Sequence, residues 1–333
     1  MNIYDISKEA GVSIATVSRV INGSPSVSQK TKDKVLAVIE ECGYTPNVFA
    51  RGLGLNSMNT VGILCADSSD PYLAQAIYYL EQMLRQNGYD ALLCCTGYDV
   101  TDKQKYLDLL LSKRVDAIIL VGSNFVEAED TKNNYIREAA KNVPILLLNG
   151  VLNGENIYST LCDDFHAIYE ATNALINSGV TEILYLYNSK SYSGVQKLEG
   201  YMAALRDNKL TYKEAYARHF TGDLHEVRDY LCSLANSGLH FNGIITSDDS
   251  LAIGALKYAK VAKLAIPNQL SIIGYNNSII AEYCDPELTS IDNKLETVCR
   301  NCISTLMGVF AEEDFPLKTV FSAEMIKRET TTF

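Results

Sequence analysis

The chain of 333 residues contains 29 Lys and Arg against 40 Asp and Glu, and its formal net charge is -11. That length exceeds one typical compact domain and fits a small domain joined to a larger one. No apolar run approaches the ~20 residues that span a membrane, and Asp5, Lys8 and Glu9 interrupt the start, where a signal peptide would be apolar. The nine Cys have no regular spacing, so we expect buried thiols in a cytoplasmic protein and no disulfide framework.

Residues 3–21 are predicted to form two short helices joined by a tight turn. Gly11 stands at the turn, where a residue without Cβ tolerates a positive φ, and Ser13 is a suitable N-cap for the second helix. A third helix is predicted from about Gln29 to Cys42. The residues expected to form one shared core are Ile3, Ile6, Ala10, Val17, Val20, Ile21, Val35, Ile39 and Cys42. This arrangement is typical of a helix-turn-helix that reads DNA.

From Thr60 onward, short apolar runs alternate with amphipathic stretches. The predicted strands are Val61–Ala66, Ala91–Cys95, Ala117–Val121, Pro144–Leu148, Ile183–Tyr187, Gly243–Thr246 and Leu270–Gly274. The predicted helices are Leu73–Gln86, Asp102–Ser112, Asn133–Lys141, Phe165–Asn177, Gln196–Asn208, Leu224–Ala235 and Asp249–Val261. Apolar strands between helices indicate parallel sheets covered on both faces, and the region is too long for one such sheet domain. We therefore expect two α/β lobes with a ligand cleft between them.

Three ordered motifs lie in the first 53 residues: Ala10–Val20 (AGVSIATVSRV), Gly43–Asn47 (GYTPN) and Ala50–Leu53 (ARGL). They closely resemble the headpiece of the lactose/galactose repressor family of bacterial transcription factors. The core carries further landmarks of that family, which are SDPY at 69–72, LEGY at 198–201, SDDSLAIG at 247–254, IGYNN at 273–277, DPELTSI at 285–291 and KRET at 327–330. The alternative is a three-helix protein-binding bundle, and the length of the motifs argues against it.

The resemblance implies a particular domain organisation. Residues 1–46 are expected to form the DNA-binding headpiece, and residues 47–59 a hinge helix and linker. Residues 60–333 are expected to form an effector-binding and dimerisation core of two doubly wound parallel-sheet lobes, of the type I periplasmic-binding-protein architecture. One lobe takes about residues 60–161 and 291–320, and the other about 162–290 and 321–333. The chain would cross between the lobes near Cys162, Ser290 and Phe321.

By the same resemblance, Ile14, Ala15 and Arg19 reach base edges in the major groove. Arg19 can donate a fork to guanine, and the alternatives are a phosphate contact or a surface ion pair. Residues 1–60 have a net charge of only +1, so we expect hydroxyl groups to supplement cations at the phosphates. The expected backbone contacts are Tyr4, Ser13, Thr16, Ser18 and Asn22. One such headpiece binds weakly, which predicts a homodimer on a near-palindromic DNA operator.

The hinge is expected from the family to be disordered until two copies pair on DNA, because an isolated helix of this length is unstable in water. Leu53 matches the family's leucine wedge, which enters the minor groove and bends the duplex. The alternative is a linker leucine that packs on nothing. Arg51 is expected to add a minor-groove or phosphate contact.

The effector site departs from the sugar-binding members of the family. Asn149, Lys197, Asp248 and Asn276 stand where those members commonly carry Asp, Arg, Asn and Asp. The ammonium group of Lys is a point charge, whereas the guanidinium group of Arg is planar and can donate two parallel hydrogen bonds. An amide both donates and accepts hydrogen bonds, whereas a carboxylate only accepts them. The further candidates are Asp70, Tyr72, Phe125 and Tyr192, each of which has the alternative role of a structural residue at a strand end. We expect the effector to be a sugar or a sugar derivative. The site has fewer carboxylates beside Lys197 than the sugar-binding members have, which favours a sugar acid or a sugar phosphate. The negative charge of Asp248 argues instead for an uncharged sugar.

Motifs of common enzymes are missing from the sequence, which has neither a nucleophile elbow nor a phosphate-binding loop, and its four His lack metal-ligand spacing. We therefore expect no catalysis, no cofactor and no metal. Together these features predict a dimeric repressor whose operator affinity responds to a small effector, acting either as inducer or as corepressor. The alternatives are a regulator controlled mainly by a protein corepressor and a free-standing sugar-binding sensor.

Overall fold

The computed structural model describes residues 2–21, 24–43 and 57–333. The predicted contacts Asn22, Arg51 and Leu53, and most of the predicted hinge, lie outside these residues. The headpiece consists of α1 (Ile3–Glu9), α2 (Ile14–Ile21) and α3 (Gln29–Glu41). Its core is formed by Ile6, Ala10, Val17, Val20 and Val35, all buried. Gly11 has φ +57° at the turn between α1 and α2, as the sequence predicts.

The first lobe is built on a parallel six-stranded sheet in the order β11-β5-β4-β3-β1-β2. Its strands are β1 (Thr60–Cys65), β2 (Asp90–Cys95), β3 (Ala117–Val121), β4 (Ile145–Leu148), β5 (Ile157–Cys162) and β11 (Lys318–Phe321). One face packs on α5 (Pro71–Gln86) and α13 (Leu295–Phe310), and the other on α6 (Val100–Ser112) and α7 (Asn134–Ala140). Single 3₁₀ turns, Ser123–Phe125 and Asp130–Asn133, follow β3.

The second lobe repeats this plan with the order β12-β10-β9-β8-β6-β7, in which only β12 is antiparallel. Its strands are β6 (Ile183–Tyr187), β7 (Ala217–His219), β8 (Gly243–Thr246), β9 (Ser271–Tyr275), β10 (Thr289–Asp292) and β12 (Glu324–Ile326). Helices α8 (Asp164–Asn177) and α9 (Tyr192–Asp207) cover one face. The other is covered by α10 (Leu224–Asn236) and α11 (Asp249–Ala262), with the short α12 (Ile279–Tyr283) beside them. A 3₁₀ turn, Glu214–Tyr216, precedes β7.

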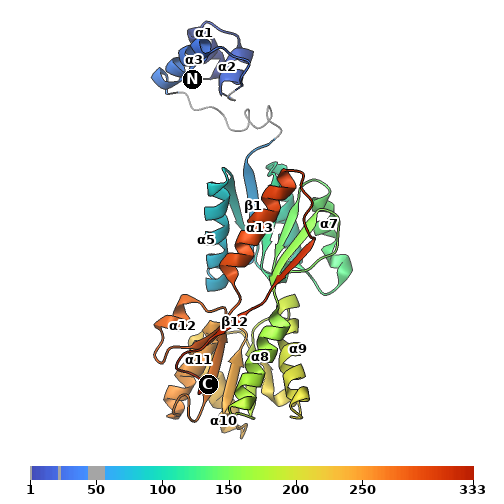
Figure 1. Cartoon of the computed structure of the whole chain (residues 1–333), viewed down its shortest axis with the longest axis vertical. Helices are drawn as coiled ribbons and strands as arrows, with labels where there is room; N and C mark the ends of the chain where they lie inside the picture. The colour runs from blue at the N-terminus through green and yellow to red at the C-terminus, as the bar shows by residue number, and fades with distance from the viewer. Residues whose placement is uncertain (1, 22–23, 44–56) are drawn as a thin grey trace.

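Three chain segments connect the two lobes (Figure 1). The chain passes from the first sheet to the second after β5, returns between β10 and α13, and crosses again between β11 and β12. At the junction, the amide of Asp163 donates to the carbonyl of Phe321 over 2.8 Å, so two of the crossings are tied together. This geometry places the carboxyl ends of the parallel strands of both sheets at the junction between the lobes.

The predicted fold class is confirmed, and all seven predicted strands are present within one residue at each end. The largest difference in a predicted helix is at α9, which begins at Tyr192 instead of Gln196. Ser191 caps it by accepting a hydrogen bond from the amide of Gly194, so the Ser-rich segment forms the first helical turn. Within the described residues, no helix combines the length and apolar character needed to cross a membrane.

Candidate effector cavity and DNA-binding surface

The headpiece exposes the side chains that the sequence predicts for DNA contact. Tyr4 on α1 and Ile14, Ala15 and Arg19 on α2 are exposed. Ser13 caps α2, because its hydroxyl accepts from the amide of Thr16 over 3.1 Å. Ser13 is exposed, and Thr16 and Ser18 are half-buried. The described residues of the predicted DNA-contact set therefore reach solvent, and their contacts with DNA stay a prediction.

A cavity of about 1130 Å³ lies between the two lobes of the core. Its walls come from segments that follow the strands of both sheets. The sequence-predicted residues that line it are Asp70, Tyr72, Asn149, Tyr192, Lys197, Asp248 and Asn276. The cavity therefore brings together side chains as far apart in the chain as Asp70 and Asn276, and their part in effector binding stays a prediction.

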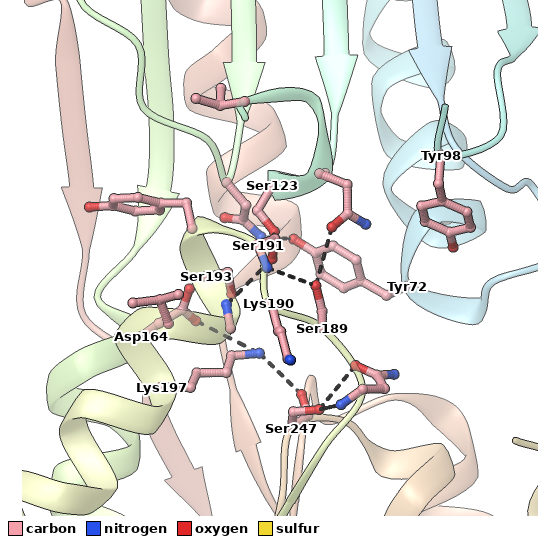
Figure 2. A pocket seen from close by; sticks show the side chains of 18 of the residues that line it. Tyr72, Tyr98, Ser123, Asp164, Ser189, Lys190, Ser191, Ser193, Lys197 and Ser247 are labelled. Atoms are coloured by element: carbon pink, nitrogen blue, oxygen red, sulfur yellow. Dashed lines mark hydrogen bonds and ion pairs between the residues drawn. The ribbon is translucent and has the colours of Figure 1, made fainter. Parts of the chain in front are cut away.

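Lys197 and Asp164 form the buried polar centre of the cavity (Figure 2). The Lys197 ammonium group donates to the carbonyl of Ser247 over 3.1 Å and lies 4.0 Å from the Asp164 carboxylate. It also lies 3.5 Å from the ring centroid of Tyr275, whose hydroxyl donates to Asp164. Burial, reinforced by the charge of Asp164, raises the pKa of Tyr275 well above its ordinary value, so this hydroxyl keeps its proton. The charge of Lys197 is thus matched within the protein.

Asp248 caps a helix and also lines the cavity. One carboxylate oxygen caps α11 by accepting from the amide of Leu251 over 2.9 Å, and the other accepts from the Asn188 amide group over 2.5 Å. Burial raises the pKa of Asp248 to about 6, although the capping hydrogen bond and the charge of Lys197 act in the opposite direction. Its neighbour Asp249 turns away from the cavity and accepts hydrogen bonds from Ser278 and Ser290.

Among the residues that the structure describes, Asn149 and Asn293 at the cavity each have a buried amide oxygen without a hydrogen-bond partner. Asn149 follows β4, is 8 % exposed and donates to the hydroxyl of Tyr72, while its own Oδ1 accepts nothing. Asn293 follows β10, is 3 % exposed and donates to Asn276 over 3.0 Å, and its Oδ1 is likewise unpartnered. An unsatisfied buried acceptor is costly, and a ligand with hydroxyl donors would satisfy these oxygens once the two amide groups turn toward the cavity.

The placement of Phe125 in the cleft is wrong. Its side chain is 1 % exposed and belongs to the hydrophobic core between the first sheet and α6 and α7. Gly122, with φ +108°, reverses the chain after β3, and the 3₁₀ turn then directs Phe125 inward. The neighbours Ser123 and Asn124 line the cavity in its place.

Several residues of the cavity were missing from the predicted set. Asp164 had a signal, because an acidic pair before a helix favours one capping carboxylate and one that faces the cleft; here Asp163 is the cap. No sequence signal marked Asn293 or Lys103, since neither residue stands directly after a predicted strand. Ser189, Lys190, Ser191 and Ser193 also line the cavity, and they were not predicted because they precede the predicted start of α9 at Gln196.

The fold and cavity define a class of protein in which a helix-turn-helix domain precedes a two-lobed core of the kind that binds small molecules. Residues 2–47 match the family model "Bacterial regulatory proteins, lacI family", and residues 172–331 match "Periplasmic binding protein-like domain". A regulator from Lachnoclostridium phytofermentans, described as an HTH-type transcriptional regulator, is 59% identical over 333 residues, which is the full length of both chains.

Solved structures share the same fold. A Lac repressor dimer bound to operator and the anti-inducer ONPF has a TM-score of 0.89 at 22% identity, covering 99% of both chains. The complex of the transcriptional regulator CelR with cellobiose has a TM-score of 0.72 at 23% identity, also with 99% of both chains covered. The chain belongs to the lacI family of bacterial regulatory proteins and is a DNA-binding transcriptional regulator, not an enzyme.

Proposed function

We propose that the chain is a dimeric repressor whose operator affinity is controlled by a sugar or sugar derivative bound between the lobes. The observation that carries this proposal is one large cavity lined from both lobes by amide, hydroxyl and carboxylate side chains, among them Asn149, Asn276 and Asp248. A polyhydroxylated molecule can donate to amide and carboxylate oxygens and accept from amide and hydroxyl groups. The CelR neighbour was solved with cellobiose, which agrees with a ligand of this chemistry.

The charges around the cavity favour an uncharged sugar over a sugar acid or sugar phosphate. Lys103 pairs with Glu127 over 2.8 Å, and Arg137 pairs with Asp130 over 2.5 Å. Lys197 is matched by Asp164, and Asp248 adds a further acidic group. Among the residues that the structure describes, Lys190 is the lining lysine or arginine for which no ion pair is found. An anionic ligand would therefore meet little unbalanced positive charge.

A thermal-unfolding screen tests the effector. A ligand at about 100 times its Kd stabilises the native state by about 2.7 kcal/mol, which is enough to shift the melting temperature visibly. We expect a neutral mono- or disaccharide to give the largest shift, and sugar acids, sugar phosphates and purines to give less. Asn276→Ala, which removes a side chain at the cavity surface, should reduce the shift, and Met202→Ala on the outer face of α9 should not. A sugar phosphate as the strongest stabiliser would contradict an uncharged effector, and no hit at all would favour control by a protein.

The dimer would use an exposed apolar surface along one side of the core. In Figure 1, α5 and α12 lie on the same side of the two lobes. The large side chains exposed in this region are Tyr78 on α5, Leu93 on β2, Tyr98 after β2, and Ile279 and Tyr283 on α12. Contiguous exposed apolar groups mark interaction sites, and a second copy is the occupant that places two headpieces on one near-palindromic operator. The hinge, with Arg51 and Leu53, would link this pairing to DNA affinity.

Arg19→Ala tests the reading of DNA by the headpiece. If Arg19 reads a guanine, the variant should lose discrimination at one base pair in each half-site, by the factor of about 5 to 150 that corresponds to roughly 1–3 kcal/mol. Fluorescence anisotropy with duplexes substituted at each position measures this, and titration should give two chains per operator. Arg206→Ala, an exposed arginine on the second lobe, is the control. An equal loss of affinity for every duplex would make Arg19 a phosphate contact.

A further inference from the structure

In the described part of the chain, two hydrogen bonds join the lobes at the cavity, in addition to the three covalent connections. The Oγ atoms of Ser123 and Ser191 lie 2.7 Å apart, and Ser189 donates to the Oδ1 of Asn124 over 3.2 Å. Figure 2 shows Ser123 above Ser191 and Ser189, at the upper edge of the second lobe. Residues 123–124 belong to the first lobe, and residues 189–191 precede α9 of the second. The two lobes are therefore in direct polar contact at this point.

Residues 123–127 on the first lobe are held in place by hydrogen bonds from Lys103 on α6. This lysine on α6 is 2 % exposed, and its ammonium group donates to the carbonyl of Asn124 over 2.5 Å and to Glu127 over 2.8 Å. The amide and carbonyl of Glu127 both bond to the side chain of Asn133, and the Tyr135 hydroxyl donates to the carbonyl of Phe125. Since the Phe125 ring is also packed in the core, residues 123–127 move only with the first lobe.

The segment on the second lobe is equally constrained. Ser191 caps α9, and its own amide donates to the hydroxyl of Ser189 over 3.1 Å. Helix α9 packs closely on α8, so residues 189–191 move with the second lobe. The contact between these two rigid segments is therefore sensitive to the angle between the lobes, and it is lost when the cavity opens.

We propose that residues 123–127 form a latch that favours the closed arrangement of the lobes, and that Lys103 is its positioning residue. The proposal rests on the proposed function only in taking the cavity as the effector site. The latch sets the resting ratio of closed to open lobes, and the apparent affinity for an effector scales with the population that can bind it. Lys103 acts through the Asn124 carbonyl and Glu127, whereas Ser123 and Asn124 make the contact itself.

Ser123→Ala is the first test, because it removes one hydroxyl group from an otherwise unchanged turn. Each neutral hydrogen bond lost should shift the closed-to-open ratio by about 2- to 10-fold. Ligand-free small-angle X-ray scattering should show a larger radius of gyration for Ser123→Ala, and a larger one still for Ser123→Ala with Asn124→Ala. Amide hydrogen exchange should rise at residues 188–194. Ser112→Ala is the control, because the Ser112 hydroxyl donates to the carbonyl of Leu109 in its own helix. Wild-type scattering and exchange in the double variant would overturn the latch.

Lys103→Met with Glu127→Gln tests the positioning role. This pair of substitutions removes both charges together, so no buried charge remains unmatched. We expect opening comparable to that of Ser123→Ala, with a melting temperature close to that of the wild type. If scattering stays at the wild-type value, Lys103 only neutralises Glu127 and the assigned role is wrong. All these readouts are ligand-free, so they stand even if the effector screen fails, and the screen can succeed even if the latch is absent.

Discussion

Replacing Gly200 with alanine is expected to lower the free energy of unfolding by about 3 kcal/mol, the upper part of the usual range for overpacking. A Cβ at this position would lie 2.2 Å from the carbonyl oxygen of Phe165 and 3.2 Å from the amide nitrogen of Tyr169. Both are backbone atoms of α8, which cannot rotate out of the way as a side chain can. Helices α8 and α9 must therefore move apart to admit a single methyl group.

The displacement would also reach the cavity, because α9 carries Lys197 and Ser193 on the turns before Gly200. Urea denaturation measures the stability of the variant, and the thermal shift with an identified effector measures its binding. Met202→Ala lies on the same helix at a side chain that is 37 % exposed, and it should change stability by only about 0.5 kcal/mol. A Gly200→Ala variant as stable as the wild type would show that α8 and α9 leave room for a methyl group at Gly200, which would contradict the close contact.

Asp248→Asn is expected to stabilise the effector-free protein by up to about 3 kcal/mol above pH 7, and to give no gain below about pH 4. Burial raises the folded-state pKa of Asp248 from 3.8 to about 6, so the native state binds this proton more tightly than the unfolded state does. As the pH rises between these two values, the unfolded chain loses its proton first, and the wild type loses stability. Asparagine carries no charge and remains a good N-cap for α11, so the variant avoids this loss.

Urea denaturation at several values between pH 4 and pH 8 measures the difference between the two proteins. Asp223→Asn is a matched control, because Asp223 also caps a helix, α10, but the hydrogen bonds from the amides of Glu226 and His225 hold its pKa below the usual value. That substitution should bring no gain in stability at neutral pH. Parallel pH curves for Asp248→Asn and the wild type would contradict the role of Asp248.

Most of the central strands and their helices were predictable because their sequence patterns are strong. Strands β3, β6 and β8 begin and end at the predicted residues, since continuous apolar runs between turn residues admit few alternatives. Strands β5 and β10 were not predicted although they are buried, because their sequences mix apolar with hydroxyl residues. Strands β7, β11 and β12 were not predicted because they are short and only partly buried at the edges of their sheets. Their position depends on neighbours distant in sequence, which local patterns do not report.

The cavity was predictable in its location and only partly in its residues. Positions after the predicted strands, such as Asn149 and Asn276, line it, whereas Asn293 follows β10, a strand that the sequence pattern did not reveal. Phe125 illustrates the opposite error, since an aromatic residue near a strand end can turn into the core as easily as into a cleft. The Tyr275–Asp164 hydrogen bond joins residues 111 positions apart, and only the folded chain brings them together.

The threefold crossing between the lobes bears on how the chain folds as it is synthesised. The first lobe lacks α13 and β11 until residues 295–321 have been made, and α13 supplies Cys299, Cys302, Ile303 and Leu306 to its core. The second lobe lacks β12 and the Thr330 hydroxyl, which donates to the carbonyl of Ile272, until residues 324–330 emerge. Neither lobe can therefore complete its sheet on the ribosome before β11 and β12 have been made, although the headpiece is free to fold as soon as it leaves the exit tunnel. A nascent chain stalled near residue 290 exposes the uncovered face of the first sheet, which makes it a natural substrate for chaperones.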